Sequence, residues 1–386
     1  MFNHLRSAVL AAGTVGLLLS GSLAAQGNKS LLVEGLQLPY KLLLTDAGNL
    51  LVTEAGGAPN TGRISRVSRS GNRVSLLEGL PSGPSNPEMT PIGPTGIVLR
   101  ERMLFVAFGE GDAVRNGPTP GSLVLNPAGV SSPLFSSVVT FRFDEDADRI
   151  ASPFVMTMVA QRMLADGHAV DLENEQGRRV HVELLTKFQG LQTDPRTVYR
   201  HSDPFGLAMG RRPETLYLVD SGQNTIAEID ASTGRWGVLT RFAPLPNPTP
   251  VGGPTIDYVP TAATVFGDEL LVTNLSGFPF VPGLASVQSL NPRTGAASPW
   301  INGLTSTIDI GIRRMPQGPQ VFVLSFSGNM RATPAALPGE LWQFDSPAGK
   351  SIATFVTPTG MAVDSATGEV FVCELGTGRI YRVATQ

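Results

Sequence analysis

The chain has 386 residues with 29 basic and 32 acidic side chains, a formal net charge of −3 and only 16% charged residues. It therefore lacks the basic surface that nucleic-acid binding requires. A single cysteine excludes an internal disulfide, and an apolar fraction of 41% excludes a disordered chain. The 43 glycines and 31 prolines are typical of short strands joined by turns.

The first 25 residues have the features of a signal peptide. His4 and Arg6 precede an apolar run over residues 8–19, and the small residues 22–25 suit cleavage after Ala25. We therefore expect residues 1–25 to be removed and the protein to be exported to the periplasm or the extracellular space. An uncleaved membrane anchor is the alternative, but the run is short for a spanning helix of about 20 residues. No later stretch is long and apolar enough to span a bilayer.

One strand-like motif recurs along the chain: an apolar run ending in Val or Leu, a polar residue, and usually a glycine. The first copy covers residues 48–56, and the aligned positions are 54, 108, 220, 274, 325 and 374. A period of about 40–50 residues with several short strands is typical of a β-propeller. Helical apolar stripes are missing from these units. The sequence therefore predicts an all-β fold, a six-bladed β-propeller.

Each repeat divides into short strands, which unit one places at residues 38–45, 49–53, 62–67 and 73–77. The last unit has only three strands before the chain ends. Residues 28–36 match residues 72–80, the closing strand of unit one, almost residue for residue. We therefore expect the N-terminal strand to complete the last blade and close the ring. Residues 26–386 would then form a single domain.

The second unit contains extra chain. The step between positions 108 and 220 is twice as long as the others, but the motif does not recur within it. We interpret residues of about 144–179 as an insertion, with a short helix at residues 156–164 and a hairpin. The return strand of this hairpin, residues 180–185, is expected to complete blade two.

Several segments together resemble the ScyD/ScyE family, which is regarded as a family of exported β-propellers. The most specific is Asp257-Tyr258-Val259-Pro260-Thr261, followed by the loop over residues 275–283, which contains Gly277-Phe278-Pro279-Phe280. Weaker matches are Gly35-Leu36 with Pro39, residues 79–82, residues 203–206 and residues 219–224. The sequence departs from the family in residues 144–179 and at Tyr258. The remaining repeats are shared with NHL-like and SMP-30/gluconolactonase-like propellers, and the resemblance implies architecture and export but no reaction.

Two sets of polar residues are candidates for a site at an end of the channel. The first opens the innermost strands and comprises Asp203, Asp257 and Asp309, with Thr95 and Thr359 at the matching starts of other blades. The second ends the second strands and comprises Glu54, Asp220, Asn274, Ser325 and Glu374. Carboxylates and an amide suit Ca²⁺ or Mg²⁺, and SMP-30-like lactonases hold a metal in a comparable place. The alternative is that these residues cap turns by accepting backbone hydrogen bonds.

Other chemistry has less support. The sequence contains no serine-nucleophile elbow, zinc motif, phosphate loop or dinucleotide fingerprint, and no ligand pattern for a quinone or haem oxidoreductase. Phe278 and Phe280 could contact a small molecule or protein partner, or could cover the channel end. The favoured function is a binding or scaffold module acting through one end of the ring. The alternative is a metal-dependent hydrolase or lactonase that uses Glu54, Asp220, Asn274 and Asp257.

Overall fold

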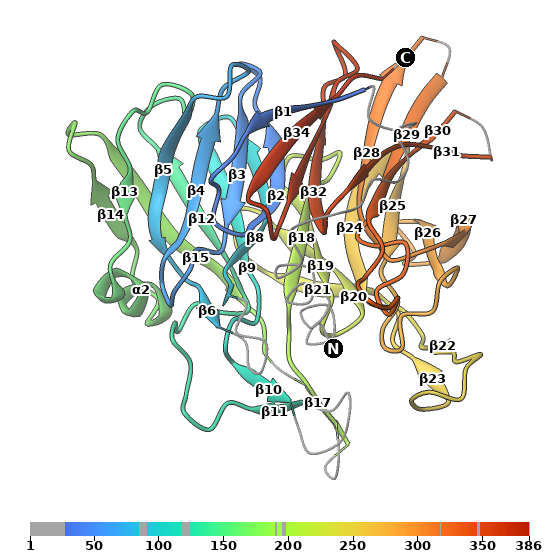
Figure 1. Ribbon diagram of the computed structural model, residues 1–386. Helices are drawn as coiled ribbons and strands as arrows, with labels where there is room; N and C mark the ends of the chain where they lie inside the picture. Colours follow the sequence, from blue (N-terminus) through green and yellow to red (C-terminus); the bar gives the residue numbers. More distant parts are fainter. Residues whose placement is uncertain are drawn as a thin grey trace.

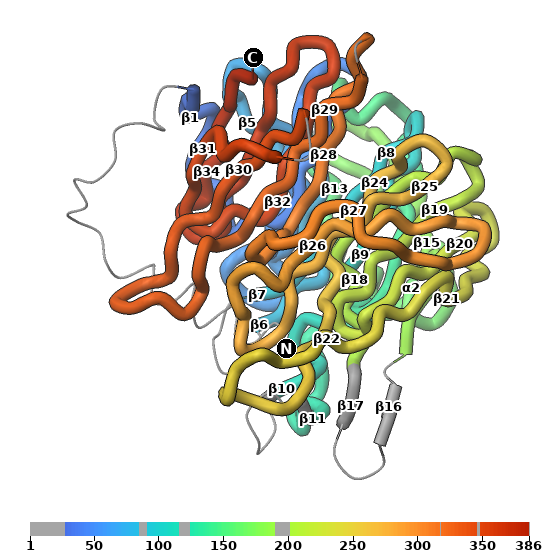
Figure 2. Tube along the Cα trace, turned by 90° about the vertical axis from the view of Figure 1, so that its right-hand side faces the viewer, coloured from blue at the N-terminus to red at the C-terminus, as the bar shows by residue number. Residues whose placement is uncertain are grey.

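Six sheets stand around a central channel (Figure 1). The computed structural model describes residues 28–84, 91–116, 123–189, 191–194, 198–316, 318–345 and 348–385. The innermost strands contact one another in blade order, and the last contacts the first. Figure 2 shows the ring from the side on which blades four and five lie. The predicted all-β, six-bladed propeller is confirmed, while the expected signal peptide at residues 1–25 lies outside the described residues.

The first three blades are described from the channel outwards. Blade one consists of β2 (Pro39–Leu44), β3 (Leu50–Glu54), β4 (Gly62–Val67) and β5 (Arg73–Leu80). Blade two consists of β8 (Pro94–Arg100), β9 (Met103–Phe108), β12 (Ser137–Phe143) and β15 (Arg179–Lys187). Blade three consists of β18 (Pro204–Met209), β19 (Thr215–Asp220), β20 (Thr225–Asp230) and β21 (Trp236–Arg241).

The other three blades follow the same order. Blade four consists of β24 (Pro260–Phe266), β25 (Glu269–Asn274), β26 (Ala285–Leu290) and β27 (Ala297–Leu304). Blade five consists of β28 (Thr307–Met315), β29 (Gly318–Ser325), β30 (Gly339–Phe344) and β31 (Lys350–Phe355). Blade six consists of β32 (Pro358–Val363), β33 (Val370–Glu374), β34 (Arg379–Val383) and β1 (Lys29–Val33).

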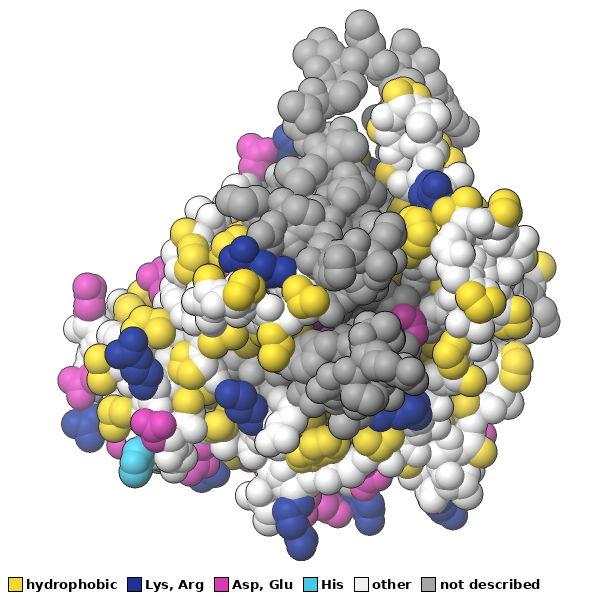
Figure 3. All heavy atoms as spheres, turned by 90° about the horizontal axis from the view of Figure 1, so that it is seen from below, with side chains coloured by type: hydrophobic (Ala, Val, Ile, Leu, Met, Phe, Trp, Pro, Cys, Tyr) yellow, Lys and Arg dark blue, Asp and Glu magenta, His cyan; other side chains and the backbone are white. Residues whose placement is uncertain are grey.

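The long connections lie at one end of the ring, which we call the lower end after its place in Figure 1. Each innermost strand begins there and each second strand ends there. Four short two-stranded sheets lie in these connections: β6 (Gly83–Pro84) with β7 (Pro91–Ile92), β10 (Val114–Asn116) with β11 (Leu123–Leu125), β16 (Leu191–Asp194) with β17 (Val198–Arg200), and β22 (Leu245–Pro246) with β23 (Thr255–Ile256). Figure 3 views this end, where apolar side chains are scattered among basic and acidic ones.

The repeated motif is a second strand that is buried on both faces. Leu50 and Val52 of β3 pack in an apolar cluster shared with blade six, whereas Leu51 packs in the cluster shared with blade two. The second strands of the other blades alternate in the same way, so that each boundary between neighbouring blades has its own apolar cluster. This explains why the motif is an uninterrupted apolar run, since neither face of the strand meets water.

The N-terminal strand closes the ring, as predicted. β1 pairs antiparallel with β34, and Lys29, Ser30 and Leu31 lie opposite Val383, Arg382 and Tyr381. The ammonium of Lys29 donates to the carbonyl of Thr354 in blade five at 2.7 Å and lies 4.4 Å from the ring centroid of Tyr381. The closing strand is therefore tied to two blades.

The insertion in blade two covers the outer edges of two sheets. β13 (Phe154–Val155) pairs in parallel with β5, and β14 (Val170–Glu173) pairs with β15. Between them lies α2 (Met158–Ala165), whose first turn is capped by the Thr157 hydroxyl accepting from the Ala160 N–H at 3.2 Å. Phe154, Ala160 and Leu164 extend the apolar cluster between blades one and two. In the part of the chain that the structure describes, no helix is long and apolar enough to cross a membrane.

We call the boundary between blades six and one the seam, and Arg69 spans it. Its Nη1 donates to Glu369 Oε2 at 2.6 Å, its Nη2 contacts Asp364, and its guanidinium lies 4.9 Å from the ring centroid of Phe371. Burial alone would raise the pKa of Asp364. Hydrogen bonds from Arg69 and from the backbone N–H groups of the next turn outweigh burial and lower that pKa to about 2.

Cys373, two residues after Phe371 on β33, is buried on the same face of the strand, within the apolar cluster of the seam. Its thiol contacts the carbonyl of Gly360 at 3.5 Å and that of Tyr40 at 3.8 Å. Burial raises the pKa of the Cys373 thiol to about 11. The cysteine is therefore a small apolar core residue in a thiol form that does not ionise at neutral pH.

Deleting residues 28–36 is expected to abolish cooperative folding, because blade six would lose its outer strand and expose the edge of β34. Thermal unfolding followed by circular dichroism tests this expectation. A truncated chain that keeps the melting transition of the full mature chain would contradict ring closure by β1.

Replacing Arg69 by Ala is expected to lower the free energy of unfolding at pH 7 by about 1–3 kcal/mol, because charged hydrogen bonds are lost at the seam. The pKa of Asp364 lies below its unfolded value of 3.8, so its contribution is present above that pH and is lost as pH falls towards 2. Urea unfolding at a series of pH values should show the difference between wild type and Arg69→Ala shrinking over this range. A difference that does not change with pH would argue against this ion pair.

Candidate functional site

Neighbouring blades are joined around the channel by a ring of hydrogen bonds from hydroxyl groups to backbone carbonyls. At five of the six blade boundaries, a Thr or Ser hydroxyl donates to the carbonyl of a residue at the start of the next innermost strand. The donor and acceptor pairs are Thr53 and Thr95 at 3.1 Å, Thr95 and Pro204 at 2.7 Å, Ser221 and Pro260 at 2.6 Å, Thr261 and Thr307 at 3.0 Å, and Thr359 and Pro39 at 2.8 Å. Each bond crosses from one blade to the next.

Close approach of the strands makes these bonds possible. A Cβ atom added at Gly96 would lie 2.7 Å from the backbone nitrogen of Leu207, and one at Gly360 would lie 2.6 Å from the carbonyl oxygen of Tyr40. Both distances are too short for a side chain. Glycine at these positions therefore lets an innermost strand lie directly against the next one.

The boundary between blades five and six is the exception. There the carboxylate of Asp309 on β28 accepts a hydrogen bond from the backbone N–H of Met361 on β32 at 2.9 Å. Its other oxygen accepts from the N–H of Ile310 at 3.0 Å. Asp309 thus bridges two blades with a charge where the other boundaries use a neutral hydroxyl.

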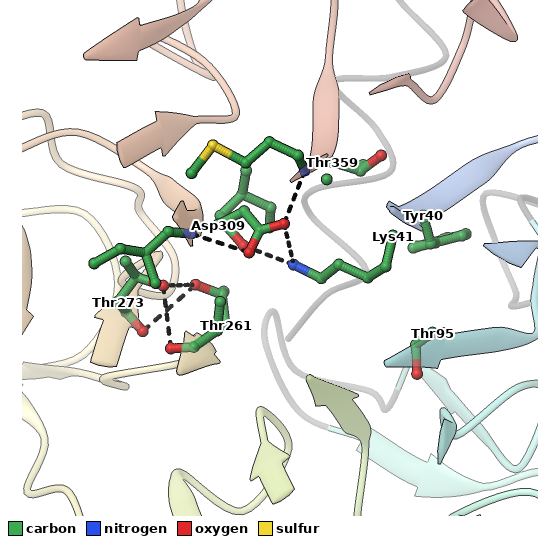
Figure 4. Close-up of polar contacts among 12 residues, drawn as sticks. Tyr40, Lys41, Thr95, Thr261, Thr273, Asp309 and Thr359 are labelled. Carbon is green, nitrogen blue, oxygen red and sulfur yellow. Dashed lines mark hydrogen bonds and ion pairs between the residues drawn. The ribbon is translucent and has the colours of Figure 1, made fainter. Parts of the chain in front are cut away.

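Lys41 of blade one neutralises this carboxylate (Figure 4). Its ammonium lies 3.3 Å from Asp309 Oδ2, donates to the carbonyl of Ile308 at 3.0 Å, and sits 4.9 Å from the ring centroid of Phe205. The side chains are 7% and 12% exposed for Lys41 and Asp309. The buried ion pair therefore reaches from β2 past blade six to β28.

Apolar side chains close the lower end of the channel beneath this pair. Tyr40, Phe205 and Ile308 occupy equivalent positions in blades one, three and five, and all three belong to one buried cluster. The rings of Tyr40 and Phe205 meet edge to face at 6.3 Å. Blades two, four and six have Thr95, Thr261 and Thr359 at the same position. Bulky apolar groups and bonded threonines thus alternate around the axis.

Above the ion pair the channel holds a cavity of about 410 Å³. Lys41 and Asp309 are the only charged residues that line it among those described. Its walls are the innermost strands of blades one to four, with residues 41–43, 96–99, 206–209 and 262–265, together with Ile310 and Met361. The cavity is a blind pocket with an ion pair at its floor, and it extends towards the upper end of the ring.

Four of the five predicted residues that end the second strands accept hydrogen bonds within or beside their own blades. Glu54 accepts from the N–H of Gln37 at 2.5 Å and contacts the Ser65 hydroxyl. Glu374 accepts from the N–H of Val356 at 2.7 Å and from the Thr377 hydroxyl at 2.6 Å. These contacts hold the loop before each blade against the second strand. Both carboxylates thus cap turns by accepting backbone hydrogen bonds.

Asp220 and Asn274 make equivalent contacts. Asp220 accepts from the Ser202 hydroxyl at 2.6 Å and from the N–H groups of Asp203 and Gln223 at 3.0 and 2.9 Å. Burial raises its pKa, although these hydrogen bonds act in the opposite direction. Asn274 accepts from the N–H and hydroxyl of Ser286, each at 2.8 Å. Its carboxamide also donates to the Tyr258 carbonyl at 3.1 Å.

Of the three aspartates expected at the openings of the innermost strands, only Asp309 lines the channel cavity. Asp203 lies immediately before β18 and accepts from the N–H of Glu110 at 3.0 Å. Asp257 lies in the loop before β24 and accepts from the Asn224 carboxamide at 3.1 Å. Among the described residues, no group of three or more His, Cys, Asp or Glu side chains is arranged to hold a metal ion.

The aromatic loop lies over the closed end of the channel. Phe280 is 3% exposed and belongs to the same buried cluster as Tyr40 and Phe205, while Phe278 is partly exposed and packs against it. The two rings meet edge to face at 6.1 Å, and the Arg331 guanidinium lies 5.3 Å from the Phe278 ring centroid. Phe278 is thus the member of the pair that a partner could reach.

Sequence reasoning missed Lys41, although a signal was present. Lys41, Gly96, Gly206, Ala262, Asp309 and Gly360 occupy the third position of the six innermost strands. Lys41 and Asp309 alone are charged in that set, and their charges are opposite. Aligning the starts of the first strands, rather than the ends of the second strands, would have paired them.

His201 lies between β17 and β18, and its side chain is partly buried. Its Nε2 lies 2.9 Å from the Ser136 hydroxyl, and that hydroxyl also donates to the Ser202 carbonyl at 2.7 Å. Because a hydroxyl has one proton, Nε2 is the donor to Ser136. Burial lowers the pKa of His201. The imidazole therefore fixes the loop between blades two and three, and it does not activate Ser136.

The fold and its blind central pocket define the class of the protein, a six-bladed β-propeller. No protein-family model and no curated protein matches the sequence. Solved structures with a similar fold include the PQQ-bound aldose sugar dehydrogenase of Streptomyces coelicolor. Its sequence is 14% identical to this one, the match covers 94% of this chain and 99% of that chain, and the TM-score is 0.49. Another is a Bacteroides thetaiotaomicron protein of unknown function, with 10% identity, coverage of 92% and 75%, and a TM-score of 0.48.

Replacing Thr95 by Val tests the ring of hydroxyl bonds. The substitution keeps the side-chain shape but removes the donor to the carbonyl of Pro204, so we expect a loss of about 1–3 kcal/mol in the free energy of unfolding. Urea unfolding measures the loss. Thr255→Val, at an exposed position of β23, is the control, and equal effects of the two substitutions would contradict the role of the ring.

Proposed function

We propose that the protein is an exported binding module that takes one small polar molecule without net charge into the central pocket. The observation that carries this proposal is the buried pair of Lys41 and Asp309 at the floor of a blind cavity. Burying two charges is costly, and apolar residues of similar size often stabilise a core as well or better. A binding role gives a reason for charges at this position.

The chemistry of the floor suggests the class of ligand. An ammonium offers three N–H donors and a carboxylate about four acceptor positions, and the described contacts leave capacity on both groups. Because the two charges cancel, neither an anion nor a cation gains a net attraction. A zwitterion or a hydroxylated neutral molecule can donate to Asp309 and accept from Lys41 at once. The volume of about 410 Å³ lies within the common range of about 300–1,000 Å³ for small-molecule sites.

The proposal that the protein is exported rests on the sequence. The apolar run over residues 8–19 and the small residues before Ala25 support secretion to the periplasm or beyond. The resemblance to the ScyD/ScyE family supports an exported propeller. No arrangement of the described residues specifically favours the metal-dependent lactonase, so we propose binding alone.

Thermal shift measurements on the mature chain test this proposal. The panel contains neutral monosaccharides, polyols, amino acids and betaines, with organic acids and amines as charged counterparts. At least one uncharged or zwitterionic compound should raise the melting temperature, since a ligand at 100 times its Kd adds about 2.7 kcal/mol of stability. Lys41→Met should weaken this binding at least tenfold.

Lys350→Met is the matched control, because Lys350 is an exposed lysine on the outer strand β31. It should bind the same compound as the wild type does. A panel in which no uncharged compound stabilises the protein would overturn the proposal, as would equal binding by the Lys41→Met variant.

A further inference from the structure

The backbone of the innermost strands forms much of the wall of the central pocket. In blades two, three and four the lining runs without a break over residues 96–99, 206–209 and 262–265. Side chains of a strand alternate between its two faces, and neighbouring blades cover both faces here. Ile97, for example, packs in the apolar cluster between blades one and two, whereas Val98 packs in the cluster between blades two and three. Successive residues therefore line the pocket through the edge of the strand.

Each innermost strand stands at the channel edge of its sheet, next to the second strand. In an antiparallel pair, alternate residues direct their N–H and C=O towards the partner, and the residues between them direct both groups away from it. In blade three the N–H of Gly210 donates to the carbonyl of Thr215 at 2.8 Å, and the register continues without a shift as far as Leu207. Ala208 therefore directs its backbone groups to β19, while Met209 and Leu207 direct theirs into the channel.

The fourth residue of every innermost strand occupies the position that Leu207 has in blade three. All six of these residues line the pocket, namely Leu42, Ile97, Leu207, Ala263, Ile310 and Met361. The contacts of Asp309 agree with this orientation, because its carboxylate accepts hydrogen bonds from the N–H groups of Ile310 and Met361. In blades one to four the register directs the N–H and C=O of the fourth residue into the pocket in the same way. A ring of backbone donors and acceptors therefore stands above the ion pair.

This ring narrows the class of ligand that the pocket takes, an inference that rests on the proposed function. A hydroxyl group donates and accepts at once, so it matches an N–H and a C=O that lie side by side on a strand edge. The methyl groups of a betaine offer no donor to the backbone carbonyls. An amino acid that binds Asp309 and Lys41 through its ammonium and carboxylate has only its side chain left for the ring. Backbone groups covered by such ligands lose their hydrogen bonds to water without replacement.

We propose that the pocket selects a cyclic polyol, either a monosaccharide or a cyclitol. The hydroxyl groups of such a molecule stand around the rim of a single ring, so they meet donors and acceptors from several strands of the channel wall together. Hydroxyls directed at the floor donate to Asp309 and accept from Lys41. A linear polyol must lose more conformational freedom to make the same contacts, so we expect it to bind more weakly.

Isothermal titration calorimetry of the mature chain tests the proposal. The cyclic compounds are glucose, galactose, mannose and myo-inositol, and the comparison compounds are sorbitol, glycine betaine, serine and proline. At least one cyclic compound should bind with one molecule per chain, about tenfold or more tightly than every comparison compound. Its deoxy analogues, each of which lacks one hydroxyl, should bind about three- to tenfold more weakly than the parent compound.

Proline substitutions test the orientation of the strand edge. Ala263→Pro removes an N–H that faces the pocket, so the variant should keep a cooperative melting transition and bind the cyclic polyol at least about threefold more weakly. Thr264→Pro removes the N–H of a residue that pairs with Leu271 of β25, so it should unfold at a much lower temperature. Ala263→Ser keeps the N–H and should bind the compound as the wild type does.

The outcomes separate this inference from the proposed function. If a zwitterion or sorbitol binds in a way that Lys41→Met abolishes, and no cyclic compound binds as tightly, the choice of a cyclic polyol is overturned and the proposed function stands. Failure of every uncharged and zwitterionic compound overturns both. Equal affinities for the cyclic compound and its deoxy analogues would contradict the ring of backbone groups, as would equal losses of stability in Ala263→Pro and Thr264→Pro.

Discussion

The fold depends on how closely each innermost strand lies against the next. At the lower end of the channel the strands approach within backbone contact, so their carbonyl groups are cut off from water and need a donor from a neighbouring blade. A threonine or serine hydroxyl meets this need at five boundaries. The same contacts fix the distance between neighbouring blades. The apolar clusters between the sheets pack at this distance.

The sixth boundary links this structural requirement to the candidate function. At this boundary the Asp309 carboxylate accepts a hydrogen bond from a backbone N–H, whereas at the other boundaries a hydroxyl donates to a carbonyl. Because the carboxylate is buried, it requires a cation, and Lys41 provides one from across the channel. A local departure from the repeat therefore places two charges at the floor of the pocket. The blades are otherwise close to equivalent, so the ion pair makes one side of the channel polar. A ligand in the pocket can therefore bind in a defined orientation.

The sequence was sufficient for the fold and only partly sufficient for the site. The buried runs around Leu50 and Val372 repeat in every blade, and the match between residues 28–36 and 72–80 predicted which strand closes the ring. The repeat that predicted the blades also suggested Glu54 and Glu374 as site residues. In the structure, the described contacts of both side chains are those of turn caps. Lys41 has no local motif, and its partner is 268 positions away in the sequence numbering (Lys41 to Asp309). Only the circular arrangement of the blades brings the two together.

The position of Cys373 has a practical consequence. It is the one cysteine in the chain, and it is completely buried in the apolar cluster where the two ends of the polypeptide meet. A thiol reagent can reach it only when blades six and one separate. The rate at which this thiol is modified under native conditions therefore reports how often the ring opens, and it gives the energetics of closure without an added label.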